Sequence, residues 1–539
     1  MKCVVCNPIP IDLEQAKLRN PAIPVYGSSV YLCGVVQALL RYGTYDRYCV
    51  KSQRAGQEGS VQLDSRIFLY SNASPPQFQP DDDVILFAGA PAMFVMSPWR
   101  ALLKKPDAPI VGTIHSMHED TFGLVLWRLL LGGEFHEHDA LICSTSAGKR
   151  VVENLLRAIG ETAESRVAPR FRLPVIPLGL DTAEFQHSDE PGVRAGLGLP
   201  SDAFVFLYLG RFSATMKGDL APLVLLFCRR IAPKFEKAVL VLAGDDTAAQ
   251  LTPSLRALAG QLGCSDRVFV VPDITPAQKR ELYSAADVFI SPSDNTQETF
   301  GLTLVEAMSA GLPIIASDWD GYKELVDHGR TGFLAPTYFA PADESTEELR
   351  SAMALSTPAS IAAETAVDMA AVGQYMETLI TNPELRESMR REAAHKAQHR
   401  YDWKVVIRQY EELWDELLLH ARSGASRPRA TAPSLPSLGF KALFGHYATG
   451  FLNEHRLRLA VNDDASENHV LALAAKNAGR LEAKLFRALL AEVRDCGPLA
   501  ASELCSRLAG RQNGLGHLTT DHVWAHIARL LKYGLLELT

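Results

Sequence analysis

The sequence has no apolar run long enough to cross a membrane. Its richest apolar segment, residues 123–131, is interrupted by Arg128, whereas a membrane-spanning helix needs about 20 consecutive apolar residues. Met1 and Lys2 lead directly into the strand-like residues 3–6, without the apolar region and small-residue cleavage site of a signal peptide. We therefore expect a cytoplasmic protein.

A disulfide framework is also missing. The nine cysteines are an odd number scattered over 539 residues, which is typical of reduced thiols in a long chain. Cys3 and Cys6 have the C-x-x-C spacing, but a zinc site needs a second ligand pair and a redox pair needs a helix N-terminus. Because neither accompanies them, we interpret both as buried residues of a first strand.

The sequence also lacks an excess of positive charge. The formal net charge is −8, which argues against a protein held on nucleic acid by bulk electrostatics. The length suggests about three domains. Residues 422–437, which begin RSGASRPRATAPSLP, have the composition of a linker.

The most informative stretch is residues 288–336, VFISPSDNTQETFGLTLVEAMSAGLPIIASDWDGYKELVDHGRTGFLAP. Its apolar run 288–290 predicts a buried parallel strand, a polar loop follows, and a helical pattern begins after Gly301. Open α/β sheets bind ligands at the carboxyl ends of their strands, and helix N-termini attract anions. The stretch therefore predicts a phosphate site at Gly301, with Glu306 placed to accept hydrogen bonds from another part of the ligand.

The order of Glu298, Phe300-Gly301, Glu306-Ala-Met and Gly-x-Pro resembles the family-4 glycosyltransferases, retaining enzymes of the two-domain GT-B fold. The resemblance covers roughly residues 1–420. It implies that Glu298 contacts the donor sugar and that Glu306 holds the ribose. The backbone amides that would receive the diphosphate are those of Phe300, Gly301, Leu302 and Thr303. The alternative is an ordinary α/β unit with two solvated glutamates.

Two cations follow another predicted strand, residues 204–209. Arg211 and Lys217 stand just past its carboxyl end, where surface charges are usually only solvated. Their Gly-Arg and Lys-Gly order resembles the diphosphate clamp of the family. The segment between them, residues 212–216, departs from the usual pattern, which puts the role of Lys217 in more doubt than that of Arg211.

The remaining site candidates lie at other predicted strand ends. His115 closes the strand candidate 110–114 and matches the histidine that the family places against the donor sugar, although a lone histidine is more often a structural hydrogen-bonding residue. Gly27 precedes a helix and would let the backbone approach the donor phosphate, or serve only the turn. The family recognises the nucleotide base largely through the backbone, which here would be at Asp273 and Ile274.

These elements predict an α/β protein with a small, mainly helical module at its C-terminal end. The resemblance implies GT-B architecture, with two Rossmann-like domains facing a central cleft. Residues 174–178 would form the last strand of the first domain. The expected segments are an acceptor-side domain at 1–180, a nucleotide-sugar-binding domain at 181–400, a crossover helix back to the first domain at 401–421, the linker at 422–437 and the module at 438–539.

The pattern of the module predicts three helices, at 481–493, 501–508 and 520–533, and a terminal strand, which together resemble a winged helix. The last helix has few cations for phosphates but a large apolar face. We therefore expect no nucleic-acid partner, and instead a homodimer or a protein partner bound through residues 438–539. A chain shortened within the linker should then keep its nucleotide-sugar binding. A peripheral contact with a membrane stays open.

The predicted function is the transfer of a sugar from a nucleotide diphosphate sugar to an acceptor, with retention of anomeric configuration, as in polysaccharide biosynthesis. Arg211, Lys217 and the helix amides would stabilise the leaving diphosphate, and Glu298 and His115 would orient the sugar. Glycan, lipid-linked and protein acceptors remain open. The alternatives are a nucleotide-sugar epimerase, or a nucleotide-sugar-binding scaffold that acts through its C-terminal module.

No metal ion or other cofactor is expected, because cationic side chains and helix amides already neutralise a diphosphate. Asp318 and Asp320 have the Asp-x-Asp spacing of a metal motif. They follow the glutamate-bearing helix, where the family does not use such a motif for metal.

Overall fold

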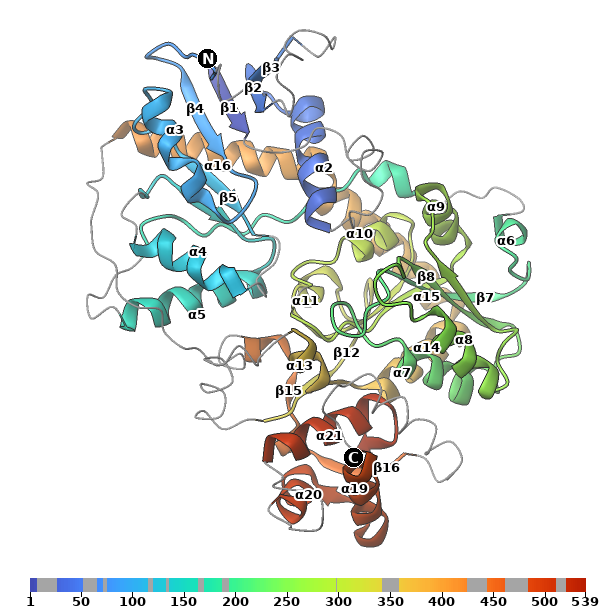
Figure 1. Cartoon of the computed structure of the whole chain (residues 1–539). Coiled ribbons are helices and arrows are strands. Elements are labelled where there is room, and N and C mark those ends of the chain that lie inside the picture. Colours follow the sequence, from blue (N-terminus) through green and yellow to red (C-terminus); the bar gives the residue numbers. More distant parts are fainter. Residues whose placement is uncertain are drawn as a thin grey trace. The chain divides into compact units, whose positions relative to one another are not determined.

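The computed structural model describes most of the chain (Figure 1). The described residues are 1–6, 27–51, 65–70, 75–114, 120–131, 135–162, 169–186, 193–296, 298–341, 358–423, 444–460, 483–509 and 520–539. The chain forms two compact units, the first from Met1–Thr182 and Gln398–Pro436, and the second from Ala183–Ala397 and Ser437–Thr539. Within the described ranges, no helix has the length and apolar character needed to cross a bilayer.

The first unit is built on a parallel sheet that has six strands in the described residues, in the order β3-β2-β1-β4-β5-β6. The strands are β1 (Lys2–Cys6), β2 (Arg47–Lys51), β3 (Ile67–Tyr70), β4 (Asp83–Phe87), β5 (Ile110–Thr113) and β6 (Ala140–Ile142). Cys3 and Cys6 are buried in β1, as predicted. Burial raises the pKa of the Cys3 thiol to about 11, which keeps it unreactive.

The helices of the first unit are α2 (Gly27–Tyr42), α3 (Ser97–Leu102), α4 (Asp120–Leu131), α5 (Ser146–Thr162) and α16 (Trp403–Ser423), with a 3-10 turn η1 (Met93–Val95) before α3. The strand expected at 174–178 is absent from the described structure. Arg172 and Val175 make only isolated bridges to Ala140 and Cys143, because Pro174 and Pro177 have no N–H to donate to a ladder.

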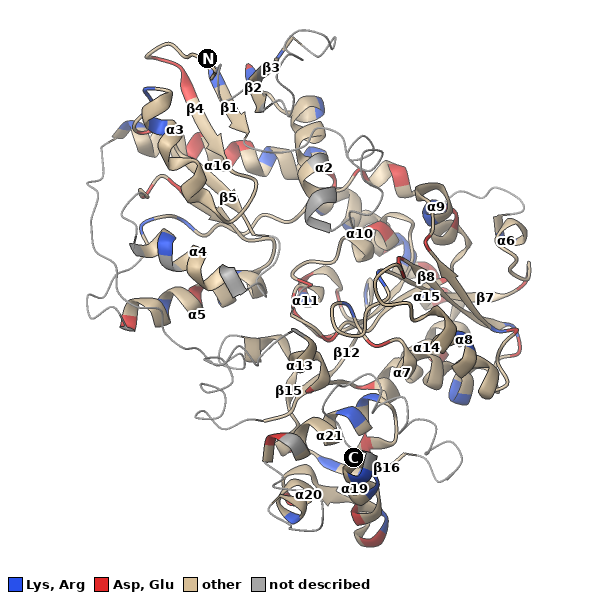
Figure 2. Cartoon of the chain, viewed as in Figure 1, with Lys and Arg blue, Asp and Glu red and all other residues tan. Residues whose placement is uncertain are grey.

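Helix α16 packs on the first unit, although in the chain it lies between the two segments of the second unit. Figure 2 shows acidic and basic residues along it, while Tyr410 and Trp414 pack edge-on or tilted against Phe87 of β4. Its Glu411 accepts hydrogen bonds from the backbone N–H of Thr44 at 2.7 Å and from the Thr44 hydroxyl at 2.9 Å. Helix α16 is therefore anchored to the first unit by both apolar and polar contacts.

The second unit contains a second parallel sheet, with six strands in the described residues and the order β12-β11-β10-β7-β8-β9. The strands are β7 (Phe204–Leu209), β8 (Ala238–Gly244), β9 (Val268–Pro272), β10 (Val288–Ser291), β11 (Ile314–Ser317) and β12 (Gly332–Ala335). From β7 the chain adds strands in one direction, and from β10 it adds them in the other. The loops after β7 and β10 therefore flank the topological switch point, where open α/β sheets bind ligands.

The helices of this unit lie between its strands and after them. They are α6 (Val193–Gly196), α7 (Ala221–Leu226) with the π-turn η3 (Phe227–Ile231), α8 (Thr252–Gln261), α9 (Pro276–Ala285), α10 (Leu302–Ser309), α11 (Tyr322–Leu325), α13 (Pro358–Ala363), α14 (Met369–Thr381), α15 (Pro383–Lys396) and the π-turn η4 (Ala397–Tyr401), which continues into the first unit. The predicted α/β class with two Rossmann-like sheets is confirmed.

The C-terminal residues share the core of the second unit. Strand β15 (Gly450–Phe451) pairs with β13 (Thr337–Phe339), which also pairs with β14 (Thr365–Val367). The rest comprises β16 (Arg456–Leu459), α19 (Ala483–Cys496), β17 (Leu499–Ala500), α20 (Ala501–Leu508), α21 (Thr520–Lys532) and β18 (Leu536–Leu538), with 3-10 turns η5 (Gly445–Tyr447) and η6 (Leu452–Glu454).

The three expected helices and the terminal strand are present. The sheet of this module, in the order β17-β16-β18, differs from the wing of a winged helix, which is a hairpin that follows the last helix. Strand β18 pairs with β16, which precedes all three helices. The apolar face of α21 is buried within the chain, at Val523, Trp524, Ile527, Leu530 and Leu531. The apolar face of α21 is therefore not available to a partner, and a homodimer or protein partner bound through residues 438–539 stays a prediction.

The packing of α16 on the first unit can be tested at Trp403, the first residue of that helix. A Cβ added at Gly179 would lie 2.2 Å from the Trp403 ring, so Gly179→Ala should destabilise the protein by about 1–3 kcal/mol through overpacking. Thermal unfolding measures the effect. The control is Gly123→Ala, since a Cβ there meets nothing within 4 Å. Equal melting temperatures for the two variants would show that Trp403 is not packed in this way.

Candidate functional site

The loops after β7 and β10 lie side by side at the switch point of the second unit. The Ser293 hydroxyl donates a hydrogen bond of 2.8 Å to the backbone carbonyl of Lys217. A Cβ at Gly218 would lie 3.1 Å from the backbone carbonyl oxygen of Pro292, so the two backbones approach closely here. The close approach of the two backbones places their functional side chains in one site.

Lys217 and Glu298 form an ion pair between these two loops, through Nζ and Oε2. The side chains are 26% and 12% exposed, respectively. The lysine whose role was in more doubt is therefore in direct contact with the glutamate predicted to touch the donor sugar. Arg211 is partly buried at the end of β7, and its backbone carbonyl accepts a hydrogen bond from the Tyr208 hydroxyl at 3.3 Å.

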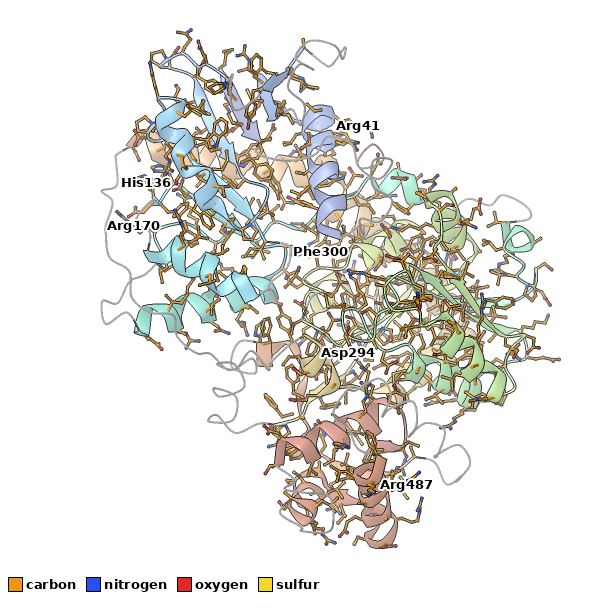
Figure 3. The ribbon with its side chains drawn as sticks, viewed as in Figure 1. Arg41, His136, Arg170, Asp294, Phe300 and Arg487 are labelled. Atoms are coloured by element: carbon orange, nitrogen blue, oxygen red, sulfur yellow. The ribbon has the colours of Figure 1, made fainter. Side chains whose placement is uncertain are left out.

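Helix α10 begins at the predicted position, because Gly301 takes a conformation that suits glycine. Its φ is 111°, and a Cβ there would lie 2.5 Å from the Tyr322 ring, so both backbone strain and lack of space exclude a larger residue. Phe300 is buried and is labelled in Figure 3. Leu302 and Thr303 then form the first turn, and since Gly301 has no side chain, no side-chain cap occupies the start of the helix.

Glu306 is a buried carboxylate with two partners from helix α9. Its Oε1 accepts a hydrogen bond from Lys279 Nζ at 2.5 Å, and its Oε2 accepts one from the Tyr283 hydroxyl at 2.8 Å. Burial and the neighbouring Glu306 charge raise the pKa of Tyr283 well above its usual range, so the hydroxyl stays protonated and able to donate. These contacts fix the carboxylate on the face of α10 one turn after the helix start.

Sequence reasoning missed Lys279 and Tyr283. Their spacing of four residues within helix α9 puts them on one face. This spacing is the signal that could have identified a pair directed at a neighbouring element. The cation at Lys279 also lies 5.5 Å from the centroid of the Phe185 ring.

The remaining candidates lie in other parts of the chain. His115 lies outside the described residues, and Gly27 is the first residue of α2 in the first unit. Asp273 has a φ of 54° after β9, and its Oδ1 accepts a hydrogen bond from the backbone N–H of Asp246 at 3.1 Å. Its carboxylate therefore braces two loops. Base recognition by the backbone of Asp273 and Ile274 stays a prediction.

Asp318 and Asp320, the pair with metal-motif spacing, have separate environments. Asp318 Oδ2 accepts a hydrogen bond of 2.6 Å from the Thr449 hydroxyl. Asp320 is fully buried; burial is the main cause that raises the pKa of its carboxyl well above the usual range, and the Glu298 charge adds to it. In the described part of the chain, no group of three or more His, Cys, Asp or Glu residues could hold a metal ion.

Residues 189–369 match the family described as Glycosyl transferases group 1. The D-inositol 3-phosphate glycosyltransferases of Acidothermus cellulolyticus and Streptomyces avermitilis are each 31% identical to this chain, over 231 and 229 residues, respectively. These alignments cover 42% and 41% of this chain and 51% and 48% of the relatives. The chain thus spans about half the length of the curated relatives it matches.

Two solved structures share the fold. The Anabaena protein HepE, crystallised in complex with UDP, has a TM-score of 0.51 and 19% identity, over 77% of this chain and 100% of that one. A glycosyltransferase from Rickettsia africae has a TM-score of 0.50 and 16% identity, over 77% and 98%. At this level of identity the likeness supports the fold alone, which is the expected GT-B fold.

The pairing of Glu306 with Lys279 can be tested by measuring the stability of variants. Lys279→Met should leave the buried carboxylate without its cation and destabilise the protein by about 1–3 kcal/mol, a range that allows for the partial exposure of Lys279. Adding Glu306→Gln to that variant should recover most of the loss, as measured by urea unfolding. The control Lys237→Met breaks an exposed pair with Asp202 at 2.8 Å and should change little. Additive losses at Lys279 and Glu306 would contradict a direct interaction.

Proposed function

Because residues 189–369 belong to the group 1 glycosyltransferases, we propose that this protein transfers a sugar from a nucleotide diphosphate sugar to an acceptor and retains the anomeric configuration. The observation that supports it most is the Lys217–Glu298 pair, next to a helix start with no side-chain cap, at the switch point of the second unit. A cation, a carboxylate and a helix N-terminus are what a diphosphate bonded to a sugar requires.

The reaction breaks the bond between the anomeric carbon and the diphosphate, so negative charge develops on the leaving group. Lys217, Arg211 and the backbone amides from Phe300 to Thr303 are the groups that would stabilise this charge. Glu298 would accept hydrogen bonds from the sugar hydroxyls, and its contact with Lys217 would couple the position of the sugar to that of the diphosphate.

Glu306 would hold the ribose of the donor. Its carboxylate is fixed by Lys279 at 2.5 Å and by Tyr283 at 2.8 Å, so it needs no reorganisation when ribose hydroxyls donate to it. The leaving diphosphate would take the proton of the acceptor hydroxyl as the new glycosidic bond forms on the same face. His115 stays a candidate for orienting the sugar, and Gly27 for approaching the donor phosphate.

A donor screen tests the proposal directly. Purified protein is incubated with UDP, GDP and ADP sugars, with and without glycan, lipid-linked and protein acceptors, and free nucleotide is measured. UDP sugars are the first choice because HepE was crystallised with UDP. Release that depends on an acceptor supports a transferase, whereas isomerisation of the donor without release would indicate an epimerase. Binding without turnover under all conditions would support a scaffold.

Glu298 gives the sharpest test of the site. Glu298→Gln removes the charge from the Lys217 pair and should lower kcat by at least about tenfold, since the hydrogen bonds to the reacting sugar weaken. Glu387→Gln, which alters a 57% exposed glutamate of α15, is the matched control. If Glu298→Gln turned over as fast as the control, Glu298 would have no role in donor contact.

The reaction should be independent of metal ions. Arg211, Lys217 and the helix amides supply positive charge to the diphosphate, and the two aspartates with metal-motif spacing have separate environments, with Asp318 bonded to Thr449 and Asp320 fully buried. We therefore expect the initial rate to be unchanged, within error, by an excess of EDTA. Loss of activity in EDTA that added manganese restores would contradict this assignment.

A further inference from the structure

Helix α21 and the residue that follows it, Tyr533, place three buried polar side chains against the loops of the candidate donor site. Lys532 Nζ forms an ion pair with Asp294 Oδ2, and the Tyr533 hydroxyl donates a hydrogen bond to Asp219 Oδ2. Arg529 Nη2 lies 3.6 Å from the same Asp219 oxygen. None of these side chains is more than 3% exposed, and Asp294 is labelled in Figure 3.

The two aspartates occupy the loops that hold the site residues. Asp219 follows Lys217 by two residues, and Asp294 precedes Glu298 by four. The other oxygen of Asp219, Oδ1, accepts a hydrogen bond of 3.1 Å from the backbone N–H of Ala221, at the start of α7. The C-terminal helix thus contacts both loops that contribute to the Lys217–Glu298 pair.

Because the carboxylates of Asp219 and Asp294 are buried, the two loops need these contacts to keep their conformation. A carboxylate that loses its partner inside a protein costs several kcal/mol unless it moves to water or takes up a proton. Asp294 is fully buried, so its loop can keep this path only while Lys532 remains opposite it. Burial lowers the pKa of Lys532 to about 8, and the Asp219 charge opposes that shift. The ammonium therefore depends on the aspartates in turn.

We propose that α21 positions the donor site, with Lys532 holding the loop after β10 and Tyr533 holding the loop after β7 in the arrangement that pairs Lys217 with Glu298. This inference rests on the proposed function for its consequence, which is donor affinity. It replaces the expectation that a chain shortened in the linker keeps its nucleotide-sugar binding. Lys532 and Tyr533 are positioning residues, because they act through the aspartates.

Lys532→Met in the full-length chain tests the role of the ammonium. We expect the Kd of UDP, measured by calorimetry, to rise about tenfold in this variant, as for the loss of a charge-assisted contact. Lys532→Arg keeps the charge and should recover part of the affinity. Lys484→Met, which changes an exposed lysine of α19 in the same module, is the matched control and should bind UDP like the wild type.

Tyr533→Phe is the milder variant, in case Lys532→Met does not fold. It removes only the hydroxyl bonded to Asp219, and it should raise the Kd of UDP severalfold while the folded fraction at 25 °C is unchanged. A purely structural role would lower the melting temperature of either variant and leave the Kd of the folded protein unaltered, which would overturn the proposal.

Hydrogen exchange separates this inference from the proposed function. In the Lys532→Met and Tyr533→Phe variants, peptides that cover residues 213–220 and 292–300 should exchange faster than in the wild type, while those of β7 and β8 should not. Unchanged exchange in the two loops would overturn the positioning role. If the wild type bound neither UDP nor any other donor nucleotide, the proposed function would fail, yet the exchange result would still decide whether α21 holds the loops.

Discussion

The need to pair carboxylates that are buried or partly buried at one end of a parallel sheet shapes the second unit. Glu298, Glu306, Asp219 and Asp294 all lie in or next to the loops at the switch point, and each has a cation or hydroxyl as its partner. The partners come from three elements: the β7 loop, helix α9 and helix α21. Because an unpaired buried carboxylate is costly, the shape of the candidate donor site depends on where these elements pack.

The sequence predicted what short-range patterns determine. Apolar runs identified strands such as β7 and β10, and Gly301 marked the start of α10 because its left-handed φ of 111° needs glycine. The order of Glu298 and Glu306 around that start predicted the place of the candidate site. The prediction of a strand at 174–178 was wrong, because it relied on the apolar pattern and did not allow for the N–H groups that its two prolines lack.

Long-range partners could not be predicted in this way. Lys532 and Asp294 are 238 residues apart in the sequence, and Tyr533 and Asp219 are 314 apart. The apolar face of residues 520–532 correctly indicated burial, but a periodic pattern does not tell which surface covers it. It was therefore interpreted as a face for a partner, although the chain covers it with its own second unit.

A crystal structure with UDP bound tests the central claim most directly. We expect the diphosphate oxygens within hydrogen-bond distance of Lys217 Nζ and of the backbone amides at the start of α10, and the ribose hydroxyls on the Glu306 carboxylate. In the same structure, Asp294 of the loop after β10 should still form its ion pair with Lys532. UDP bound away from the switch point of the second unit, or bound there without contact to Lys217 and Glu306, would contradict the assignment of the donor site.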